Sequence, residues 1–182
     1  MKLDNLRDLY IEQLQDLYSA EEQLTSALPQ MVEAAAHPEL KTAFQSHLEQ
    51  TRQHRDRLEQ VLADLAGTPS GAEGSMMESI YKALGRSPSG EKCEAMAGLI
   101  REGEHMVNAN ADQDVRDAGL IAAAQRVEHY EIAAYGTVCT YAKLLGRTSD
   151  KDILGRTLDE EKATDEKLTD LATRIVNLDA AA

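Results

Sequence analysis

Apolar residues recur at every third or fourth position through four long stretches of the chain, which is the spacing of an amphipathic α-helix. The stretches predict helices over about residues 4–36, 38–66, 112–145 and 149–178. Asp4 and Ser149 are suited to the N-cap positions of the first and fourth helices. Gly67 and Gly146 are suited to the ends of the second and third. Pro29 is expected to kink or break the first helix locally.

A long connection separates the second predicted helix from the third. It spans about residues 68–111, in which TPSGAEG and GRSPSGE are typical of loops, whereas SMMESIYKAL and CEAMAGLIREGEHMVNA are typical of shorter helices. Short links join antiparallel neighbours, and one long crossover is the connectivity of ferritin-like bundles. We therefore expect an all-α, ferritin-like four-helix bundle in a single domain, residues 1–182.

Polar residues interrupt the apolar stripe of each long helix near its middle. They are Glu21 on the first helix, His47, Thr51 and His54 on the second, Glu128 and Glu131 on the third, and Glu161 and Asp165 on the fourth. A carboxylate in a core is costly unless it is paired or protonated, and several together repel one another. A cation removes both costs, and carboxylates with imidazole suit iron and manganese. We predict metal ligation by Glu21, His54, Glu128, Glu131 and Glu161, with His47, Thr51 and Asp165 as further candidates.

Several of these residues also have a simpler interpretation, among them His54, which could be a surface or hydrogen-bonded histidine. Two glutamates three positions apart on a helix usually face solvent, and Glu161 lies in the charged run LDEEKATDEKL, which is typical of a solvated face. The helical phase argues for burial, because Glu161 shares its stripe with Leu154 and Leu168. Glu160 and Glu166 lie off that stripe and are expected at the surface. The coincidence of four polar mid-helix positions favours the metal site.

Composition and charge narrow the function classes. The net charge of −13 without a basic patch argues against a nucleic-acid partner, and no apolar run is long enough for membrane insertion. The N-terminus lacks the apolar segment of a signal peptide, so we expect a cytoplasmic protein. Cys93 and Cys139 lack the spacing of a metal finger and are expected to be buried free thiols. Glycine-rich phosphate loops and the GxSxG elbow are absent from the sequence.

Four segments make the sequence similar to a known family: DLYSAEEQLTSALPQM, KCEAMAGLI, LIAAAQRVEHYEIAAYGT and EEKATDEKLTDLA. They resemble the YciE/YciF family of bacterial stress-associated ferritin-like proteins over nearly the whole chain. The resemblance implies a four-helix bundle related to the rubrerythrins, a homodimer, a di-metal site and induction under stress.

The wider rubrerythrin-like pattern has one Glu on the first helix, Glu-x-x-His on the second, paired Glu on the third and Glu-x-x-His on the fourth. Glu21, Glu128 and Glu131 match their positions. Thr51 stands where the second helix has its Glu, and Thr164 where the fourth has its His. The remaining ligands suit two metals whose coordination is completed by water, a single metal, or weak metal binding. His47 and Asp165 could replace the two missing ligands, because each lies about one helical turn away on nearly the same helix face.

These observations lead to two hypotheses for function. The first is a metal-binding ferritin-like stress-response protein that acts as a di-iron or di-manganese oxidase or peroxidase, with two iron ions and with oxygen or peroxide as reactant. The second is a non-enzymatic structural or interaction protein with a degenerate metal site. Iron storage ranks below both, since nothing in the sequence indicates a cage. The catalytic residues cannot be assigned from the sequence.

Overall fold

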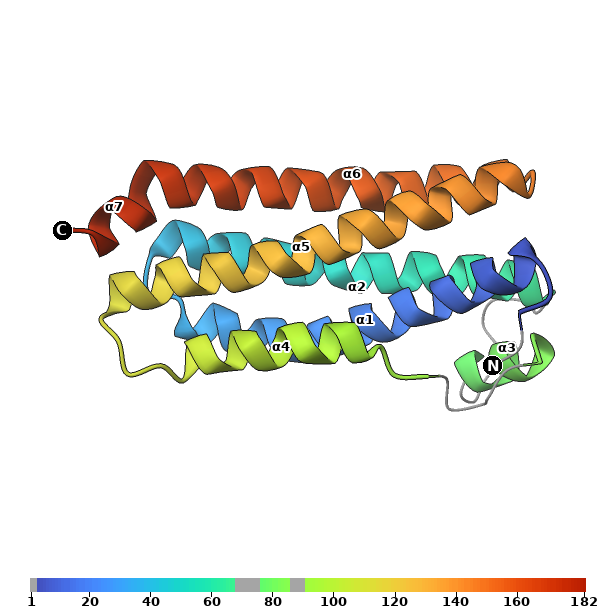
Figure 1. Cartoon of the computed structure of the whole chain (residues 1–182), viewed down its shortest axis with the longest axis horizontal. Helices are drawn as coiled ribbons and strands as arrows, with labels where there is room; N and C mark the ends of the chain where they lie inside the picture. The colour runs from blue at the N-terminus through green and yellow to red at the C-terminus, as the bar shows by residue number, and fades with distance from the viewer. Residues whose placement is uncertain (1–2, 68–75, 86–90) are drawn as a thin grey trace.

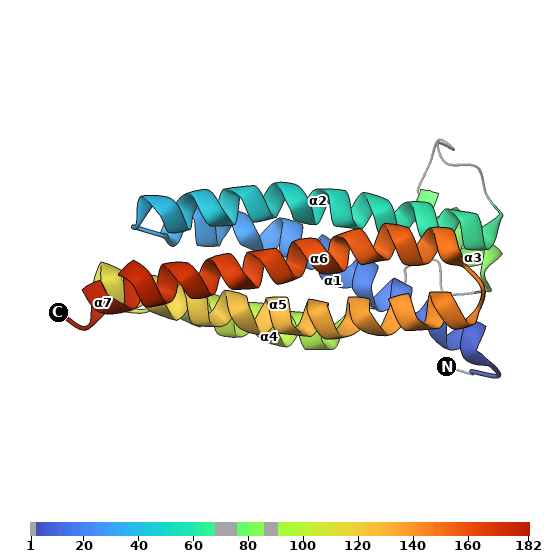
Figure 2. The same cartoon turned by 90° about the horizontal axis from the view of Figure 1, so that it is seen from above.

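The computed structural model describes residues 3–67, 76–85 and 91–182, and no strand occurs among them. Four long helices form the bundle, namely α1 (Leu6–Ala34), α2 (Pro38–Ala66), α5 (Gln113–Leu144) and α6 (Thr148–Leu171). Figures 1 and 2 show α1 antiparallel to α2 and α5 antiparallel to α6, with α2 and α5 parallel. The all-α, ferritin-like bundle expected from the sequence is confirmed.

Two short helices lie in the crossover between α2 and α5. They are α3 (Met76–Ala83), which packs against α2, and α4 (Glu94–Val107), which lies along α1 and α5 (Figure 1). The expected loops TPSGAEG and GRSPSGE fall almost entirely in residues 68–75 and 86–90, outside the described part of the chain. Cys93 caps α4, its Sγ accepting a hydrogen bond from the Met96 N–H. Cys93 is buried, as expected, whereas the other free thiol, Cys139, is only half-buried because it lies on the flank of α5.

The helix ends differ in detail from the sequence expectations. Asn5, rather than Asp4, caps α1 and accepts a hydrogen bond from the Asp8 N–H at 3.0 Å. α1 continues through Pro29 to Ala34 without a break. α6 begins at Thr148, so Ser149 lies inside the helix and is not its cap. Gly67 and Gly146 do take left-handed conformations after α2 and α5.

The C-terminal end of the fourth bundle helix changes its hydrogen-bonding pattern. α6 passes at Leu171 into a π-helical turn (Ala172–Val176), which α7 (Asn177–Ala180) follows. The expected helix over residues 149–178 is therefore three successive helical segments. In the described part of the chain, no helix is both long enough and apolar enough to cross a membrane.

Apolar clusters occupy both ends of the bundle. One cluster contains Tyr10, Leu62 and Leu154, and the other contains Phe44 and Leu168. On every long helix the predicted polar positions lie between the residues of these two clusters. The core therefore has a polar middle enclosed by two apolar ends, and any group bound there is shielded from solvent along the bundle axis.

Candidate metal centre

Six ionisable side chains from four helices converge at the middle of the bundle. Glu21 comes from α1, His47 and His54 from α2, Glu128 and Glu131 from α5, and Glu161 from α6, and each is at most 3% exposed. His47 and His54 face the same interior because seven residues make two helical turns, and Glu128 and Glu131 do so because they lie one turn apart. The structure thus brings together all five of the main predicted ligands, together with His47.

The six side chains form two groups in which one nitrogen or oxygen atom from each residue lies within 4.8 Å of the others. One group is His47, Glu128, Glu131 and Glu161, and the other is Glu21, His54 and Glu161. Glu161 belongs to both groups. Each group contains one imidazole and at least two carboxylates, which is a ligand set that suits iron or manganese.

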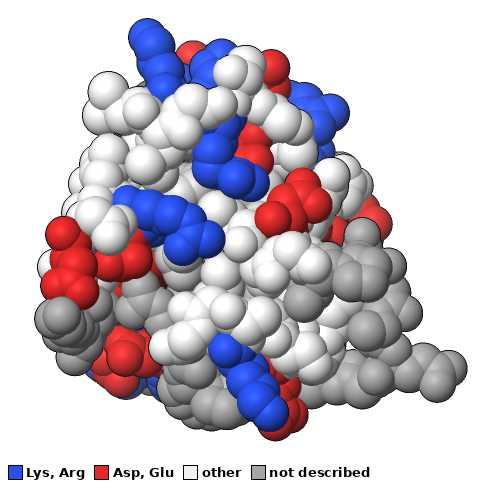
Figure 3. Space-filling model, turned by 90° about the vertical axis from the view of Figure 1, so that its right-hand side faces the viewer, with Lys and Arg blue, Asp and Glu red and all other residues white. Residues whose placement is uncertain are grey.

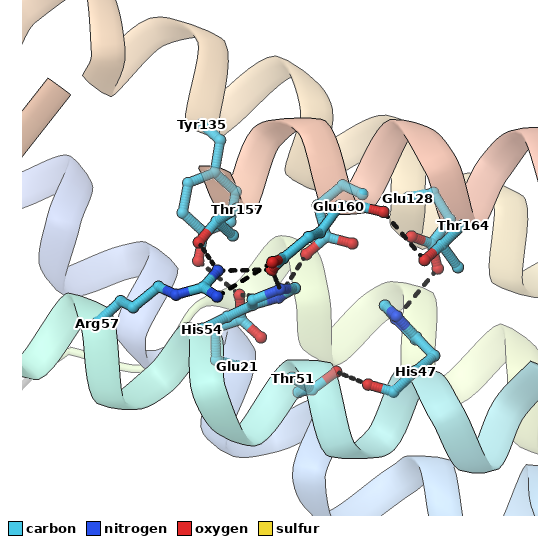
Figure 4. A network of polar contacts seen from close by, with 11 residues as sticks. Glu21, His47, Thr51, His54, Arg57, Glu128, Tyr135, Thr157, Glu160 and Thr164 are labelled. Carbon is cyan, nitrogen blue, oxygen red and sulfur yellow. Dashed lines mark hydrogen bonds and ion pairs between the residues drawn. The ribbon is translucent and has the colours of Figure 1, made fainter. Parts of the chain in front are cut away.

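Several contacts within the centre join an imidazole to a carboxylate. His47 Nε2 lies 3.2 Å from Glu128 Oε1, and His54 Nδ1 lies 2.8 Å from Glu161 Oε1 and 3.6 Å from Glu21 Oε1. Figure 4 shows His47 and His54 projecting from α2 towards the carboxylates of the other helices. Both histidines therefore face the same polar interior from one helix.

Most of these buried polar atoms have no hydrogen-bond partner among the described residues. They are Glu21 Oε2, both ring nitrogens of His47, His54 Nδ1, Glu128 Oε2, and both oxygens of Glu131 and Glu161. Native proteins leave few buried polar groups unsatisfied, because each one costs about 1–3 kcal/mol. So many acceptor atoms facing one interior fit a bound cation better than they fit a set of internal hydrogen bonds.

The electrostatics of the centre favour protonation of its carboxyl groups when no cation is bound. Burial, together with the neighbouring carboxylates, raises the pKa values of Glu128 and Glu131 well above the usual value. Burial also raises the pKa of Glu21 to about 8, against the opposing charge of His54. Burial acts in the same direction on Glu161, but the adjacent His54 imidazolium lowers its pKa overall. Cation binding would therefore displace protons.

The pKa values of the two imidazoles are shifted in opposite directions. Burial lowers the pKa of His47, which favours the neutral ring that ligates metal. Burial also acts to lower the pKa of His54, but Glu161 and Glu21 raise it to about 8. In the metal-free protein His54 and Glu161 therefore form an ion pair at neutral pH.

Two of the further candidates, Thr51 and Asp165, lie differently from the main ligands, as does Thr164, which stands where the related pattern has its His. The Thr51 hydroxyl donates to the backbone carbonyl of His47 at 3.0 Å, and the Thr164 hydroxyl donates to that of Glu160 at 3.1 Å. Asp165 is on the flank of α6, where it accepts a hydrogen bond from Gln125 at 3.1 Å and lies 3.6 Å from the exposed His129. Asp165 belongs to neither ligand group, and both threonine hydroxyls donate to backbone carbonyls.

Glu160 was expected at the surface, and its side chain is 32% exposed, but it also reaches the buried centre, which the sequence did not indicate. Its Oε2 lies 2.8 Å from His54 Nε2, and Arg57 donates to its two oxygens at 2.5 and 3.1 Å (Figure 4). Burial acts to raise the pKa of Glu160, but the hydrogen bonds from Arg57 and His54 hold it below its usual value. Arg57 also donates to Thr157 at 3.0 Å. In the sequence, Arg57 lies three residues after His54, and Thr157 lies three residues before Glu160. Residues at this spacing share a helix face, and this was the sequence signal that could have indicated the contact.

Tyr135 completes the polar interior on the α1 side. Its hydroxyl donates to Glu21 Oε1 at 2.6 Å, and its ring meets that of His54 edge to face at 6.4 Å. Burial and the adjacent carboxylates raise the pKa of Tyr135, so the phenol keeps its proton. It therefore orients Glu21 as a hydrogen-bond donor.

The chain is similar to known proteins over almost its whole length. Residues 5–83 and 75–181 match the family model described as a domain of unknown function, DUF892. Protein YciF of Escherichia coli (strain K12) is 44% identical over 177 residues, which are 97% of this chain and 96% of YciF.

Solved structures share the arrangement of helices. The crystal structure of the E. coli stress protein YciF matches with a TM-score of 0.81 and 42% identity, covering 96% of this chain and 99% of that one. YcfI from Rhodopseudomonas palustris matches with a TM-score of 0.76 and 39% identity, over 92% and 95% of the two chains. A Xanthomonas campestris protein at 22% identity and a TM-score of 0.63 shares the fold.

Proposed function

The chain belongs to the DUF892 family and is a homologue of the E. coli stress protein YciF, and on that premise we propose that it is a stress-response protein that binds iron or manganese inside its bundle. We further propose that the centre takes two ions and acts as an oxidase or peroxidase towards oxygen or peroxide. The stress role is suggested by the name of the relative, and the metal by this chain's own residues.

One observation carries the metal assignment. Atoms of four carboxyl groups and two imidazoles face a single interior with no hydrogen-bond partner among the described residues. A core without a cation would have to keep these groups protonated or repelling one another, and each arrangement lowers the free energy of unfolding. One or two divalent cations would satisfy most of these atoms together.

The residues present divide naturally between two ions. His47, Glu128 and Glu131 would hold one, Glu21 and His54 the other, and Glu161 would be shared. Bound iron supplies electron transfer to oxygen or peroxide in ferritin-like di-iron proteins. The chain itself holds the ligands on rigid helices, keeps bulk water out by burying every one of them, and keeps a proton on Tyr135 beside Glu21.

Iron content after anaerobic reconstitution tests the metal assignment. We expect the native protein to retain iron, and the double variant Glu128→Ala with Glu161→Ala to lose it. Glu49→Ala with Glu166→Ala is the matched control, because both of these glutamates are exposed. Equal iron in native protein and site variant would overturn the proposal. Oxygen uptake or peroxide loss by the ferrous protein then tests the oxidase or peroxidase activity separately.

The second candidate is a non-enzymatic structural or interaction protein with a degenerate site. The observation that favours it is the engagement of the Thr51 and Thr164 hydroxyls with backbone carbonyls, at the two positions where rubrerythrin-like proteins carry a ligand. In that case a chelator should leave the melting temperature unchanged, whereas loss of a bound ion lowers it. A large decrease on chelation would count against this candidate.

A further inference from the structure

Glu160 connects the buried centre to the protein surface. Its side chain is 32% exposed, whereas that of His54, to which it is bonded, is 0% exposed. Arg57, at 19% exposure, holds both oxygens of Glu160 and also donates to Thr157. Figure 4 shows these groups as one continuous chain of contacts from α6 through Arg57 and Glu160 to the His54 ring.

The contacts determine which nitrogen of His54 keeps its proton when a metal binds. A carboxylate that already accepts two hydrogen bonds from a guanidinium has no proton to give, so Glu160 acts only as an acceptor. His54 Nε2 must then be the donor in the 2.8 Å contact. Nδ1 is left facing Glu161 and Glu21, the two other members of its ligand group.

We propose that Glu160, held by Arg57, is a positioning residue that presents His54 Nδ1 to the metal ion of the Glu21–His54–Glu161 group. This inference rests on the proposed function. Neither residue touches the ion in this arrangement. Their effect is to fix the tautomer and the ring orientation, which is the usual role of a carboxylate behind a metal-ligating histidine.

The other imidazole has no such support. Both ring nitrogens of His47 lack a hydrogen-bond partner among the described residues, and the neighbouring Thr51 hydroxyl is bonded to the backbone. His47 shares its group with three carboxylates, whereas His54 shares its group with two. The two ion positions are therefore unequal. Binding at the His47 position would depend on its three carboxylates, and binding at the His54 position on the orientation of its histidine. Removal of Glu160 should weaken the His54 position selectively.

Anaerobic titration with Co²⁺, whose absorption spectrum reports its coordination, tests this selectivity. The native protein should take up two equivalents. Glu160→Ala should keep the first and weaken the second about 10–100-fold. Glu160→Gln, whose amide oxygen can still accept from Nε2, should restore much of the loss. Glu166→Ala is the matched control, since Glu166 is an exposed residue of the same helix. Equal binding of the second ion by native protein and Glu160→Ala would overturn the proposal.

Nitrogen-15 spectra of the imidazoles in the metal-free protein give a second measurement that does not depend on metal binding. The native spectrum should show a proton on His54 Nε2 that is slow to exchange with solvent, and Glu160→Ala should lose that signal while the His47 signals stay unchanged. A His54 signal that is unaffected in Glu160→Ala would contradict the positioning role. A native protein that takes up no Co²⁺ would instead contradict the proposed function, and the spectra would then decide the positioning role alone.

Discussion

His54 on α2 and Glu161 on α6 face each other at the centre of the bundle, with Nδ1 and Oε1 2.8 Å apart. Despite this short distance, neither atom has a partner with the geometry of a hydrogen bond among the described residues. A ring nitrogen and a carboxylate oxygen that are held close together, but are not aligned for a hydrogen bond, are arranged as expected of ligands that would bind a common cation in place of the Nδ1 proton. The other His54 nitrogen is bonded to Glu160, which leaves Nδ1 as the inward-facing atom.

Replacement of Glu131 separates two contributions to stability: the unfavourable burial of its carboxyl group and the favourable binding of metal. Both of its oxygens are buried without a partner, and burial raises its pKa. Glu131→Gln should therefore leave the metal-free protein at least as stable as the native protein at pH 8. It should also reduce the stabilisation by saturating Fe²⁺ or Mn²⁺, which is about 2.7 kcal/mol when the free ion is at one hundred times its dissociation constant. Thermal unfolding with and without the ion measures both effects.

Glu166→Gln is the control for this experiment, because Glu166 is exposed on α6. It should respond to the ion as the native protein does. A metal-induced rise in melting temperature that is equal in Glu131→Gln and native protein would remove Glu131 from the ligand set.

The metal-free protein should lose stability as the pH rises from about 6.5 to 8. The pKa of His54 is raised from 6.5 to about 8 and that of Glu21 from 4.5 to about 8. In this window the folded state binds more protons than the unfolded state, so the free energy of unfolding falls with increasing pH. The lowered pKa of His47 acts in the opposite direction, but mainly below pH 6.5.

Urea unfolding at pH 6.5 and pH 8, in the presence of a chelator, measures this dependence. Saturating metal should reverse it, since ligand atoms that have lost their protons bind the ion more tightly. A metal-free stability that rises between these pH values would show that the buried carboxyl groups are not protonated in the folded protein.

Asp117 should be important for the α1–α2 connection. Its buried carboxylate accepts from the Ala36 N–H at 3.0 and 3.2 Å and from the His37 N–H at 2.6 Å. Asp117→Ala removes the acceptor for both backbone groups and should lower the free energy of unfolding by about 2–4 kcal/mol. Asp159→Ala, an exposed position on α6, should change it by less than about 0.5 kcal/mol. Urea titration of the two variants measures the difference, and equal effects would contradict this role of Asp117.

Two glycines of α5 provide a matched test of helix packing. A Cβ at Gly136 would have no atom within 4 Å, whereas one at Gly119 would lie 2.9 Å from Met106 Sδ. Gly136→Ala should raise the free energy of unfolding by about 0.5–1 kcal/mol, because Gly is a poor helix former. Gly119→Ala should gain less, since the Met106 side chain must move. Denaturant unfolding compares them, and a larger gain at Gly119 would contradict this account.

The sequence was sufficient to find the helices and most of the inward-facing ionisable residues. Glu161 illustrates why: it lies in a charged run, yet its phase relative to Leu154 and Leu168 places it in the interior, where it is 0% exposed. A period of 3.6 residues separates the buried face of a long helix from its exposed face, even when the local composition is polar. The long crossover predicted the connectivity for a similar reason, because its length allows a parallel neighbour.

The helix ends could not be predicted as well. Asn5 caps α1 although Asp4 was an equally suitable residue, and α6 begins one residue before the expected Ser149. Several adjacent residues can supply a cap, and the choice depends on how the chain enters the bundle. The π-helical turn at Ala172–Val176 likewise had no signal in the apolar pattern.

The sequence by itself determined that four amphipathic helices carry acids and histidines in their buried stripes. Only the tertiary structure decided which of those groups meet. His47 joins the centre, Asp165 binds Gln125 instead, and Glu160 reaches His54 from a position that the helical phase places outside the stripe. The physical reason is that periodicity fixes the direction in which a Cβ leaves its helix, whereas contact also depends on the rotation of neighbouring helices and on the reach of a long side chain.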